Sequence, residues 1–587
     1  MSARAIRAER AAKTRRGSIQ FLEPSRPKLT HRELAICLCL ALATLLVYLR
    51  TFGYDFVAYD DDYFVYLNPV IQAGLKASGV AWAFGLHLGN WHPLTWISYL
   101  IDRQIFGMHA GGFHAVNVLL HTASSVLLFV ALFRMTGRVW RCAIVAAVFA
   151  LHPLHVESVA WVSERKDVLS TLLEMIGLLL YVRYVDRPTP KRFLQLCLAF
   201  ACAVMAKPMV ITFPLILLLL DLWPLQRISW PPRWPAARRL LIEKIPLLVI
   251  SLVASVLTVI AQKAYGTVAS LESIPLPTRL ANAVTEYAAY LKQAIWPSNL
   301  AVLYPTAPPA PGAATVAAIV LLILTTAVVL FARRRPYLVT GWLWYLVMLA
   351  PVIGLVQVGA QSRADRYMYV PLVGVTVAVV WLIADGIAGH AAWRNAGAVA
   401  AAVIVAALAA GSWRQIGYWK DSRTLFEHTL AVTQNNFIMT NNLGVVLARA
   451  GDDRAAMVQY AKAIAINPDY AEAQGNLGNV MLRNRLVDSA RPLLEKAVRL
   501  KPEFPMAQLD LGIVEASSGN FPAAIAHLNE ALRMTPEDPE VHSNLCYALE
   551  HSGRIDEAIT QCRQALQLRP DYPDAQFNLR NALAAKR

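Results

Sequence analysis

The chain contains eleven apolar runs, and most of them are long enough to cross a lipid bilayer. A membrane-spanning helix needs about 20 mainly apolar residues. Of all residues, 56% are hydrophobic and 16% are charged, whereas soluble domains carry about 25% charged residues. We therefore expect an all-α fold that begins with a multi-span membrane domain over residues 33–413. The runs are 33–52, 113–133, 141–157, 167–185, 192–207, 209–223, 244–262, 313–332, 338–356, 369–388 and 396–413, of which the third, fifth and sixth are short or polar for a span.

The basic residues gather in short loops between these runs. Lys and Arg in such loops mark the cytoplasmic side of a membrane, so the net charge of +16 indicates topology and not a nucleic-acid-binding surface. Residues 1–32 are then a basic cytoplasmic tail, and an odd number of spans places the C-terminus outside. The amphipathic segment 279–296 is expected on the outer side as an interfacial helix. The other basic loops are RMTGRVWR (134–141), RYVDRPTPKR (183–192), RWPAARR (233–239) and RRRP (333–336).

A period of 34 residues governs the sequence from about residue 414. Small residues and a terminal Pro recur at this step, which is typical of tetratricopeptide repeats, pairs of helices that stack into an α-solenoid. We expect full repeats at 437–470, 471–504, 505–538 and 539–572, with a half-repeat before them (419–436) and a closing helix after them (573–587). The recurring residues are Leu443, Leu477, Leu511, Leu545 and Leu579, Ala456, Ala490, Ala524 and Ala558, and Pro468, Pro502, Pro536 and Pro570.

Charged and polar residues cluster on the outer side of this topology. Charges beside membrane spans are costly and usually functional. A carboxylate can act as a general base on a hydroxyl, and Arg and Lys can bind a phosphate leaving group. The pattern predicts group transfer from a lipid phosphate at the membrane surface. The residues are Asp60, Asp61 and Asp62 in FVAYDDDYFVYLNP (56–69), the basic residues Arg165, Lys166, Lys207, Arg363 and Arg366, and His92, His152, His155 and Glu157.

Each of these features also has a structural interpretation. The three acids can form a solvated loop, Arg165 and Lys166 can lie at the membrane interface, and Arg363 and Arg366 can pair with Asp365. The histidines in HPLH can form helix-end hydrogen bonds. No third ligand has zinc-like spacing, so no metal site is predicted, although acids beside a phosphate leave room for a divalent cation.

Several motifs resemble the transmembrane and tetratricopeptide-repeat protein O-mannosyltransferases and their bacterial relatives. The resemblance covers roughly residues 33–587. It implies a GT-C glycosyltransferase that uses a polyprenyl-phosphate sugar, inverts the anomeric carbon and carries its base in the first external loop, at Asp60 or Asp61, with Asp62 as an extra acid. The motifs are FVAYDDDYFVYLNP, HPLHVESVAWVSERKDVLS, AKPMVITFPLILLLLDLWPL, WPSNLAVLYP and ADRYMYVP.

We therefore expect an inner-membrane glycosyltransferase that moves a sugar, mannose by resemblance, from polyprenyl phosphate to a Ser/Thr hydroxyl of a protein. The compact chain and its basic tail resemble bacterial members, so the repeats are expected in the periplasm. No cofactor other than the donor lipid is predicted. One alternative is a non-catalytic membrane scaffold whose repeats recruit envelope proteins. A transporter is a second alternative, but it would place its charges near the bilayer midplane.

The repeats contain two further patterns. One residue before each repeat Leu lies a polar residue that stacking would place in a column on the inner surface. Because an Asn amide both donates and accepts hydrogen bonds, this column could hold an extended acceptor backbone; the alternative is that it spaces the helices. Cys546 and Cys562 occupy facing helices of the fourth repeat and could form a disulfide or a reduced, packed pair. The column comprises Asn442, Asn476, Asp510, Asn544 and Asn578.

Overall fold

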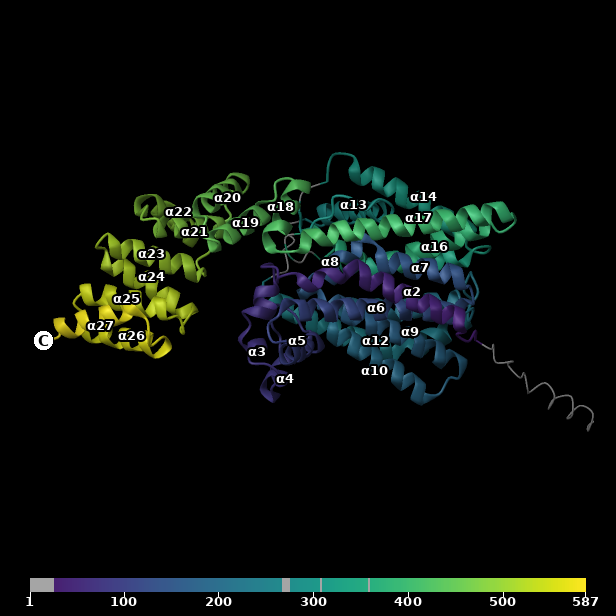
Figure 1. The fold of residues 1–587 in the computed structure, drawn as a ribbon, viewed down its shortest axis with the longest axis horizontal. Coiled ribbons are helices and arrows are strands. Elements are labelled where there is room, and N and C mark those ends of the chain that lie inside the picture. The colour runs from purple at the N-terminus through teal and green to yellow at the C-terminus, as the bar shows by residue number, and fades with distance from the viewer. Residues whose placement is uncertain (1–25, 267–274, 307–308, 357–358, 360) are drawn as a thin grey trace, which may run out of the picture.

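Apolar helices form a bundle, and a curved array of shorter helices extends from one end of it (Figure 1). The computed structural model describes residues 26–266, 275–306, 309–356, 359 and 361–587. Residues 1–25 of the predicted basic tail lie outside this part. The elements of the bundle up to the midpoint of the chain are α2 (His31–Tyr48), η1 (Leu49–Gly53), η2 (Asp62–Tyr66), α3 (Pro69–Gln72), α4 (Ala77–Ala83), α5 (Pro93–Phe106), α6 (Ala110–Thr136), α7 (Val139–Leu151), η3 (Pro153–His155), α8 (Val156–Ala160), η4 (Val162–Glu164), α9 (Arg165–Asp186), α10 (Pro190–Ala206), η5 (Pro208–Thr212), α11 (Phe213–Leu222), α12 (Trp234–Ala264) and α13 (Leu276–Ile295).

The rest of the bundle contains one small sheet and the helices that lead to the array. Strands β1 and β2 pair antiparallel, with Tyr304 opposite Arg363. This pairing brings two loops that are distant in sequence to the same end of the bundle. The remaining elements are β1 (Tyr304–Pro305), α14 (Ala313–Phe331), α15 (Pro336–Leu349), β2 (Gln361–Arg363), η6 (Asp365–Met368), α16 (Pro371–Gly386), α17 (Ala391–Ile416) and η7 (Gly417–Trp419).

Within the described residues, six helices are long and apolar enough to cross a membrane, or seven if one bent pair counts as a single span. The bent pair corresponds to the predicted run 141–157. It turns by 51° between Leu151 and Pro153, because proline has no N–H to continue the helical ladder. The runs 209–223, 338–356 and 369–388 form shorter apolar helices, and 192–207 forms α10. The multi-span helical fold is thus confirmed, but helix length alone does not give eleven spans.

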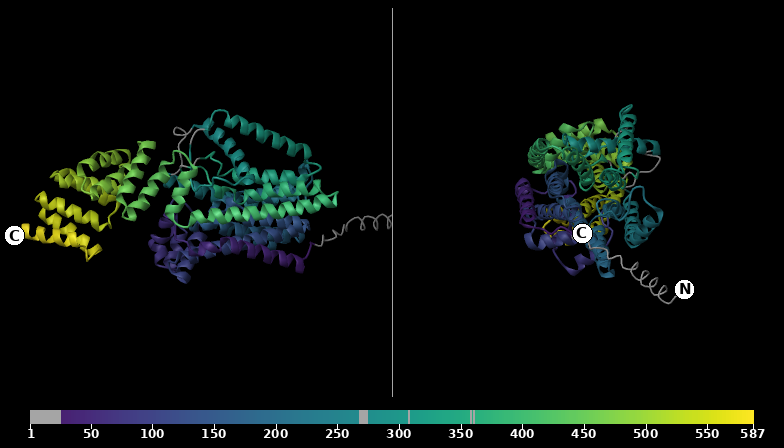
Figure 2. Two further views of the ribbon diagram at one scale, coloured as in Figure 1. Left: turned by 45° about the horizontal axis from the view of Figure 1, so that its top comes forward. Right: turned by 90° about the vertical axis from the view of Figure 1, so that its right-hand side faces the viewer.

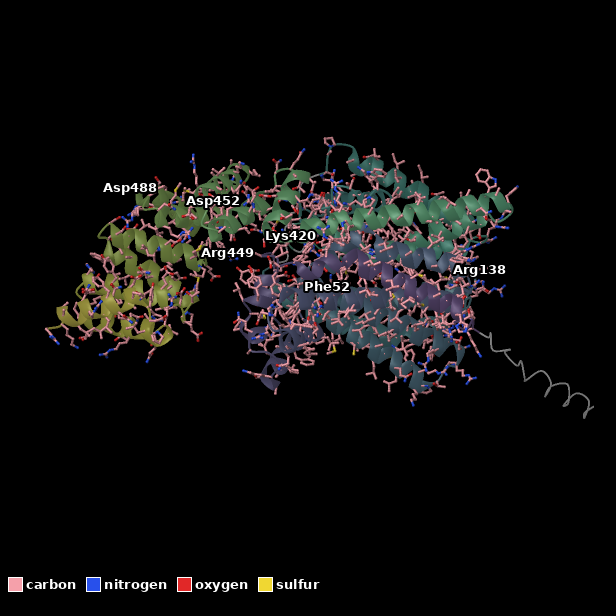
Figure 3. The ribbon with its side chains drawn as sticks, in the orientation of Figure 1. Phe52, Arg138, Lys420, Arg449, Asp452 and Asp488 are labelled. Carbon is pink, nitrogen blue, oxygen red and sulfur yellow. A yellow bond between two sulfur atoms is a disulfide. The ribbon has the colours of Figure 1, made fainter. Side chains whose placement is uncertain are left out.

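The basic loops lie together at one end of the bundle. Arg26 pairs with Asp186 at 2.7 Å, and Arg141 pairs with Asp385 at 2.8 Å. Figure 3 shows Arg138 at this end, whereas Phe52 and Lys420 lie at the other end, beside the array. We call the two the basic end and the repeat end. Their separation agrees with alternating spans, because one end collects the Lys and Arg residues that mark the cytoplasmic side.

The array is a solenoid of antiparallel helix pairs, so the predicted tetratricopeptide-repeat fold is confirmed. First helices begin at Phe437, Ala471, Pro505 and Pro539, one repeat apart. Figure 2 shows the array curving away from the bundle. Its helices are α18 (Ser422–Val432), α19 (Phe437–Arg449), α20 (Asp453–Ile466), α21 (Ala471–Arg483), α22 (Val487–Leu500), α23 (Pro505–Ser517), α24 (Phe521–Met534), α25 (Pro539–His551), α26 (Ile555–Leu568) and α27 (Pro573–Ala585).

Glycine at the eighth repeat position lets the two helices of a pair approach closely. A Cβ atom on Gly478 would lie 2.6 Å from Leu494, and one on Gly512 would lie 2.7 Å from Leu528. In the fourth repeat these two positions are Cys546 and Cys562, which are joined by a disulfide with Cα atoms 5.4 Å apart. The sequence allowed either a disulfide or a reduced, packed pair, and the structure contains the disulfide. A covalent link there replaces the glycine-to-side-chain contact.

The disulfide predicts the number of free thiols in the isolated protein. Alkylation of the denatured chain without reductant should modify five of its seven cysteines, the five that are unbonded, and all seven after reduction. Structural disulfides persist in oxidising compartments such as the bacterial periplasm. Mass analysis after labelling gives both counts. Seven labelled cysteines without reductant would show that the pair is reduced and would remove this support for a repeat domain outside the cytoplasm.

Candidate active site

The acidic loop lies at the repeat end, between η1 and η2, and bonds directly to the start of the array. The backbone N–H of Asp55 donates to the Lys420 carbonyl at 3.2 Å, and that of Ala58 donates to the Ser422 hydroxyl at 2.8 Å. The indole of Trp161 donates to the Tyr59 carbonyl at 3.0 Å. The loop is therefore fixed to both domains and is not the freely solvated run that composition alone allows.

Asp61 is a buried anchor for this loop. Its side chain is 0% exposed. One oxygen accepts from the Val57 N–H at 2.9 Å, and the other accepts from the N–H and the hydroxyl of Ser163, at 2.8 and 2.5 Å. Burial raises the pKa of Asp61 to about 7, while these hydrogen bonds lower it. A carboxylate with three donors holds the loop against η4 and has little capacity left for substrate.

Asp60 lies in a different environment from the buried Asp61. It has a positive φ of 72°, a conformation that Asp adopts more readily than most residues. Its carboxylate is half-buried and accepts no hydrogen bond from the described part of the chain. Burial raises the pKa of Asp60, and the nearby Lys166 and Arg366 lower it. Asp62 is more deeply buried and accepts from the N–H of Tyr63 at 3.1 Å. Of the three acids, Asp60 is the one best placed to meet a ligand.

A network of three cations and three carboxylates lies next to Asp60, and we call it the cation network. Glu164 is at its centre, since it pairs with Lys166 at 3.0 Å, Lys207 at 3.3 Å and Arg366 at 3.3 Å. Lys207 also pairs with Asp167 at 2.5 Å, and Arg366 pairs with Glu157. The side chains come from α8, η4, α9, η6 and the end of α10. Three regions that are distant in sequence therefore converge on one charged site.

His92 adds a neutral polar group to this site. It is 4% exposed, and its Nδ1 atom has no hydrogen-bond partner among the described residues. Burial and the charges of Lys166 and Lys207 lower the pKa of His92. The imidazole is thus neutral at physiological pH and can donate or accept one hydrogen bond. A buried polar atom without a partner is costly, which is consistent with a ligand atom completing its bonding.

The structure does not bring Arg165 and Arg363 into the cation network. Arg165 is fully buried and donates to Asp102 at 2.6 Å and to the Phe113 carbonyl at 2.8 Å, and it also contacts Asn117. Arg363 pairs with Glu286 at 3.1 Å and stacks on Tyr304, 4.0 Å from the ring centre. Arg165 is therefore part of the packed core, and Arg363 belongs to a neighbouring ion pair.

Two predicted histidines bind backbone carbonyls instead of the network. The Nε2 atom of His152 lies 3.1 Å from the Ala294 carbonyl, and the Nδ1 atom of His155 lies 2.6 Å from the Phe149 carbonyl. Both are buried where α7 breaks. Their placement matches the structural interpretation of HPLH. The described residues also contain no group of three His, Cys, Asp or Glu side chains placed to hold a metal ion.

A cavity of about 620 Å³ separates the acidic loop from the first repeats. Asp60 and Asp62 line one wall. The opposite wall carries Asn442 and Asn476 of the predicted column and also Asn441, Asn479, Tyr470 and Phe504. The acidic loop and the inner surface of the array thus border one continuous space.

Only part of the predicted column faces this space. Asp510 is buried and accepts from Asn479 at 2.9 Å, and burial raises its pKa to about 7. Asn544 donates to the carbonyl of Glu540 in its own helix, and Asn578 is buried and donates to that of Ser543. The 34-residue period did not single out Asn479, although it lies one helical turn after Asn476 and so shares its face. Asn441 donates to Asn442 and accepts from Asn476 at 2.9 Å.

Comparison with known proteins gives two kinds of match. The tetratricopeptide-repeat family models match residues 444–484, 476–539 and 509–573. Several relatives are named protein O-mannosyl-transferases. Tmtc2 of Drosophila melanogaster is 32% identical over 31% of this chain and 21% of its own length; TMTC1 of Mus musculus is 32% identical over 31% and 22%; TMTC1 of Homo sapiens is 30% identical over 32% and 23%. The alignment with each curated relative spans about a fifth of that relative's length. The resemblance to this family is thus confirmed over about a third of the chain.

The solved structures that are similar to this chain include tetratricopeptide-repeat proteins. YrrB, described as a tetratricopeptide-repeat protein with an unusual peptide-binding site, is 24% identical and covers 27% of this chain and 83% of its own, with a TM-score of 0.25. The thermophilic repeat protein TTC0263 of Thermus thermophilus is 25% identical and covers 31% of this chain and 95% of its own, with a TM-score of 0.23.

Proposed function

We propose that this protein is an inverting membrane glycosyltransferase that moves mannose from polyprenyl phosphate to a Ser/Thr hydroxyl of a protein held by the repeats. The observation that carries the proposal is the position of Asp60. Its carboxylate has no hydrogen-bond donor among the described residues, lies beside the cation network and lines the cavity shared with the array. The named relatives support protein O-mannosylation as the reaction class.

Asp60 is the proposed general base. It takes the proton of the acceptor hydroxyl while the oxygen attacks the anomeric carbon of the sugar. The bond from that carbon to the phosphate oxygen breaks, and polyprenyl phosphate leaves from the opposite face, so the configuration inverts. A base works best when its pKa approaches the working pH, and burial raises the pKa of Asp60 in that direction. Transfer should therefore fall when Asp60 is protonated at low pH.

The cation network is the proposed binding site for the donor phosphate. Lys166, Lys207 and Arg366 can donate to phosphate oxygens and stabilise the charge that develops on the leaving group. Glu164 holds all three in position before the donor arrives. His92 can supply a further hydrogen bond through its unpartnered Nδ1 atom. Arg165 and Arg363, which the sequence also suggested, are left out because they lie outside the cation network, paired with Asp102 and Glu286.

The acceptor is proposed to lie along the inner surface of the array. Asn442, Asn476 and Asn479 line the cavity opposite Asp60. An Asn side chain can pair with a peptide unit whatever side chain that residue carries. A segment held in this way would bring its hydroxyl-bearing residue across the cavity to the base with little sequence preference.

Substitution of the first two acids tests the assignment of the base. In membranes supplied with polyprenyl-phosphate mannose and an acceptor protein, Asp60→Asn should lower transfer by about 10²–10⁴-fold and leave the protein folded. Asp61→Asn should act on stability, by about 1–3 kcal/mol, because an amide cannot accept all three hydrogen bonds of Asp61. Transfer rates and thermal unfolding separate the two effects.

Wild-type transfer by Asp60→Asn would contradict its role as the base. A non-catalytic scaffold makes a different prediction, since Asp60→Asn should then preserve both its partners and its cellular phenotype. The wild-type chain would also release no polyprenyl phosphate.

Substitution of the cavity asparagines tests the mode of acceptor binding. Asn442→Ala with Asn476→Ala should keep the array helical and weaken binding by about 0.5–1.5 kcal/mol for each lost hydrogen bond. Transfer to a whole acceptor protein should fall more than transfer to a short peptide supplied in excess. Asn544→Ala is the matched control, because that side chain bonds its own helix. If transfer to both acceptors falls equally, or to neither, the column has only a structural role.

A further inference from the structure

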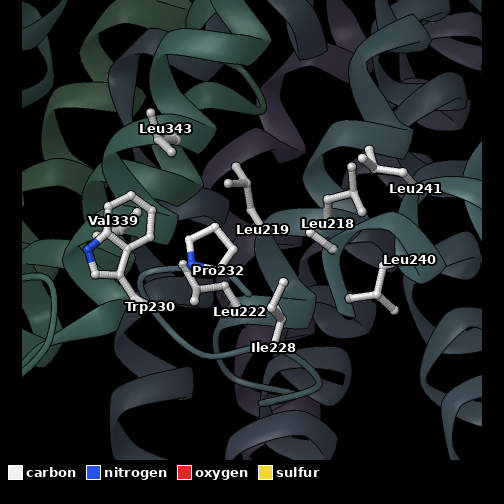
Figure 4. A pocket seen from close by; sticks show the side chains of 11 residues that line it. Leu218, Leu219, Leu222, Ile228, Trp230, Pro232, Leu240, Leu241, Val339 and Leu343 are labelled. Atoms are coloured by element: carbon white, nitrogen blue, oxygen red, sulfur yellow. The ribbon is translucent and has the colours of Figure 1, made fainter. Parts of the chain in front are cut away.

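A second cavity, of about 200 Å³, lies at the basic end between α11, α12 and α15 (Figure 4). All eleven residues that line it are apolar, apart from the nitrogen of an indole ring. Leu218 and Leu222 come from the end of α11, Leu241 from the start of α12 and Leu343 from α15. The cavity is separate from the proposed active site. Helix α11 begins a few residues after Lys207, and its other end reaches the cavity about 15–20 Å further on.

Two tryptophans near this cavity are typical of the depth where a bilayer changes from headgroups to acyl chains. Trp230 lines the cavity, and Trp234, the first residue of α12, is 69% exposed. Trp is enriched at this boundary because its ring is apolar and its N–H is polar. Beyond it, Ile242 of α12 is 53% exposed, as expected for a residue that faces lipid.

Two exposed arginines each follow a cavity-lining residue in the sequence, Arg233 after Pro232 and Arg238 after Ala237. Ala237 and Leu241 are four residues apart on α12 and share one helical face. Arg238 follows Ala237 on the adjoining face, and Arg233 immediately precedes the helix. Both are exposed and form no ion pair within the described residues. The acid nearest to them in the sequence, Glu243, is already paired with Arg227 at 2.6 Å and with Lys244 at 2.6 Å. The opening therefore combines an apolar cavity with unneutralised positive charge.

We propose that this cavity is a binding site for one anionic phospholipid of the cytoplasmic leaflet. One acyl chain fills the space between α11, α12 and α15, and Arg233 and Arg238 bind the phosphate. A neutral, zwitterionic lipid would offer the same acyl chain but less net attraction to the two arginines. Because the site lies at the basic end, it is distinct from the proposed donor site, and the bound lipid stabilises the packing of the three helices.

The test uses purified, delipidated full-length protein in detergent, titrated with dioleoyl phosphatidylglycerol or dioleoyl phosphatidylcholine. Native mass spectrometry counts the bound lipid, and thermal unfolding reports stabilisation. Phosphatidylglycerol should bind about tenfold or more tightly than phosphatidylcholine and raise the unfolding temperature further. Arg233→Gln and Arg238→Gln should each lower phosphatidylglycerol affinity by about fivefold, the effect of one basic residue at a membrane surface, without changing phosphatidylcholine affinity.

Arg239→Gln is the matched control. Arg239 carries the same charge on the same helix, but it lies two positions after Ala237 and so about 200° around the helix; its substitution should leave phosphatidylglycerol binding unchanged. Ala237→Phe fills the cavity and should abolish binding of both lipids at this site. Equal affinity for the two lipids, or equal losses in the Arg238 and Arg239 variants, would overturn the proposal. If Ala237→Phe does not fold, the arginine variants still decide the question.

Discussion

The hydrogen bonds of the buried Asp61 carboxylate fix the arrangement of the repeat end. They join the loop after the first membrane helix to Ser163, at the turn that precedes α9. At the edge of a membrane, a buried charge must be compensated by nearby donors, so this link leaves little freedom in the position of the loop. Once Asp61 is held inward, its neighbour Asp60 is left facing the cavity, and the start of α9 places Lys166 beside it.

Charge balance explains how three cations can lie close together inside the protein. Lys166, Lys207 and Arg366 are matched by Glu157, Glu164 and Asp167, so no uncompensated charge is buried before the donor binds. A phosphate that enters would compete with these carboxylates for the same donors. The network therefore orients the cations in advance, and the donor does not have to gather them from solvent.

The fold was largely predictable from the sequence because its signals are periodic. A 34-residue step specifies a helix pair whatever surrounds it, and the apolar runs specify helices. The site was predictable only as a set of residues. Arg165 and Lys166 are adjacent, yet consecutive helical positions differ by about 100°, so one enters the core towards Asp102 and the other faces Glu164. Likewise, the partner of Asp61 lies 102 residues away, and no local pattern among three consecutive acids distinguishes the anchor from the proposed base.

The central claim is that this chain glycosylates proteins and uses Asp60 to do so. Its most direct test is the intact mass of periplasmic proteins from three strains, which carry the wild-type chain, the Asp60→Asn chain or neither. Our account predicts that Ser/Thr-containing peptides gain the mass of a hexose in the wild-type strain. The same peptides should lack this added mass in the other two strains. Identical masses in all three strains would contradict this account. Added hexose mass in the Asp60→Asn strain would show that another residue is the base.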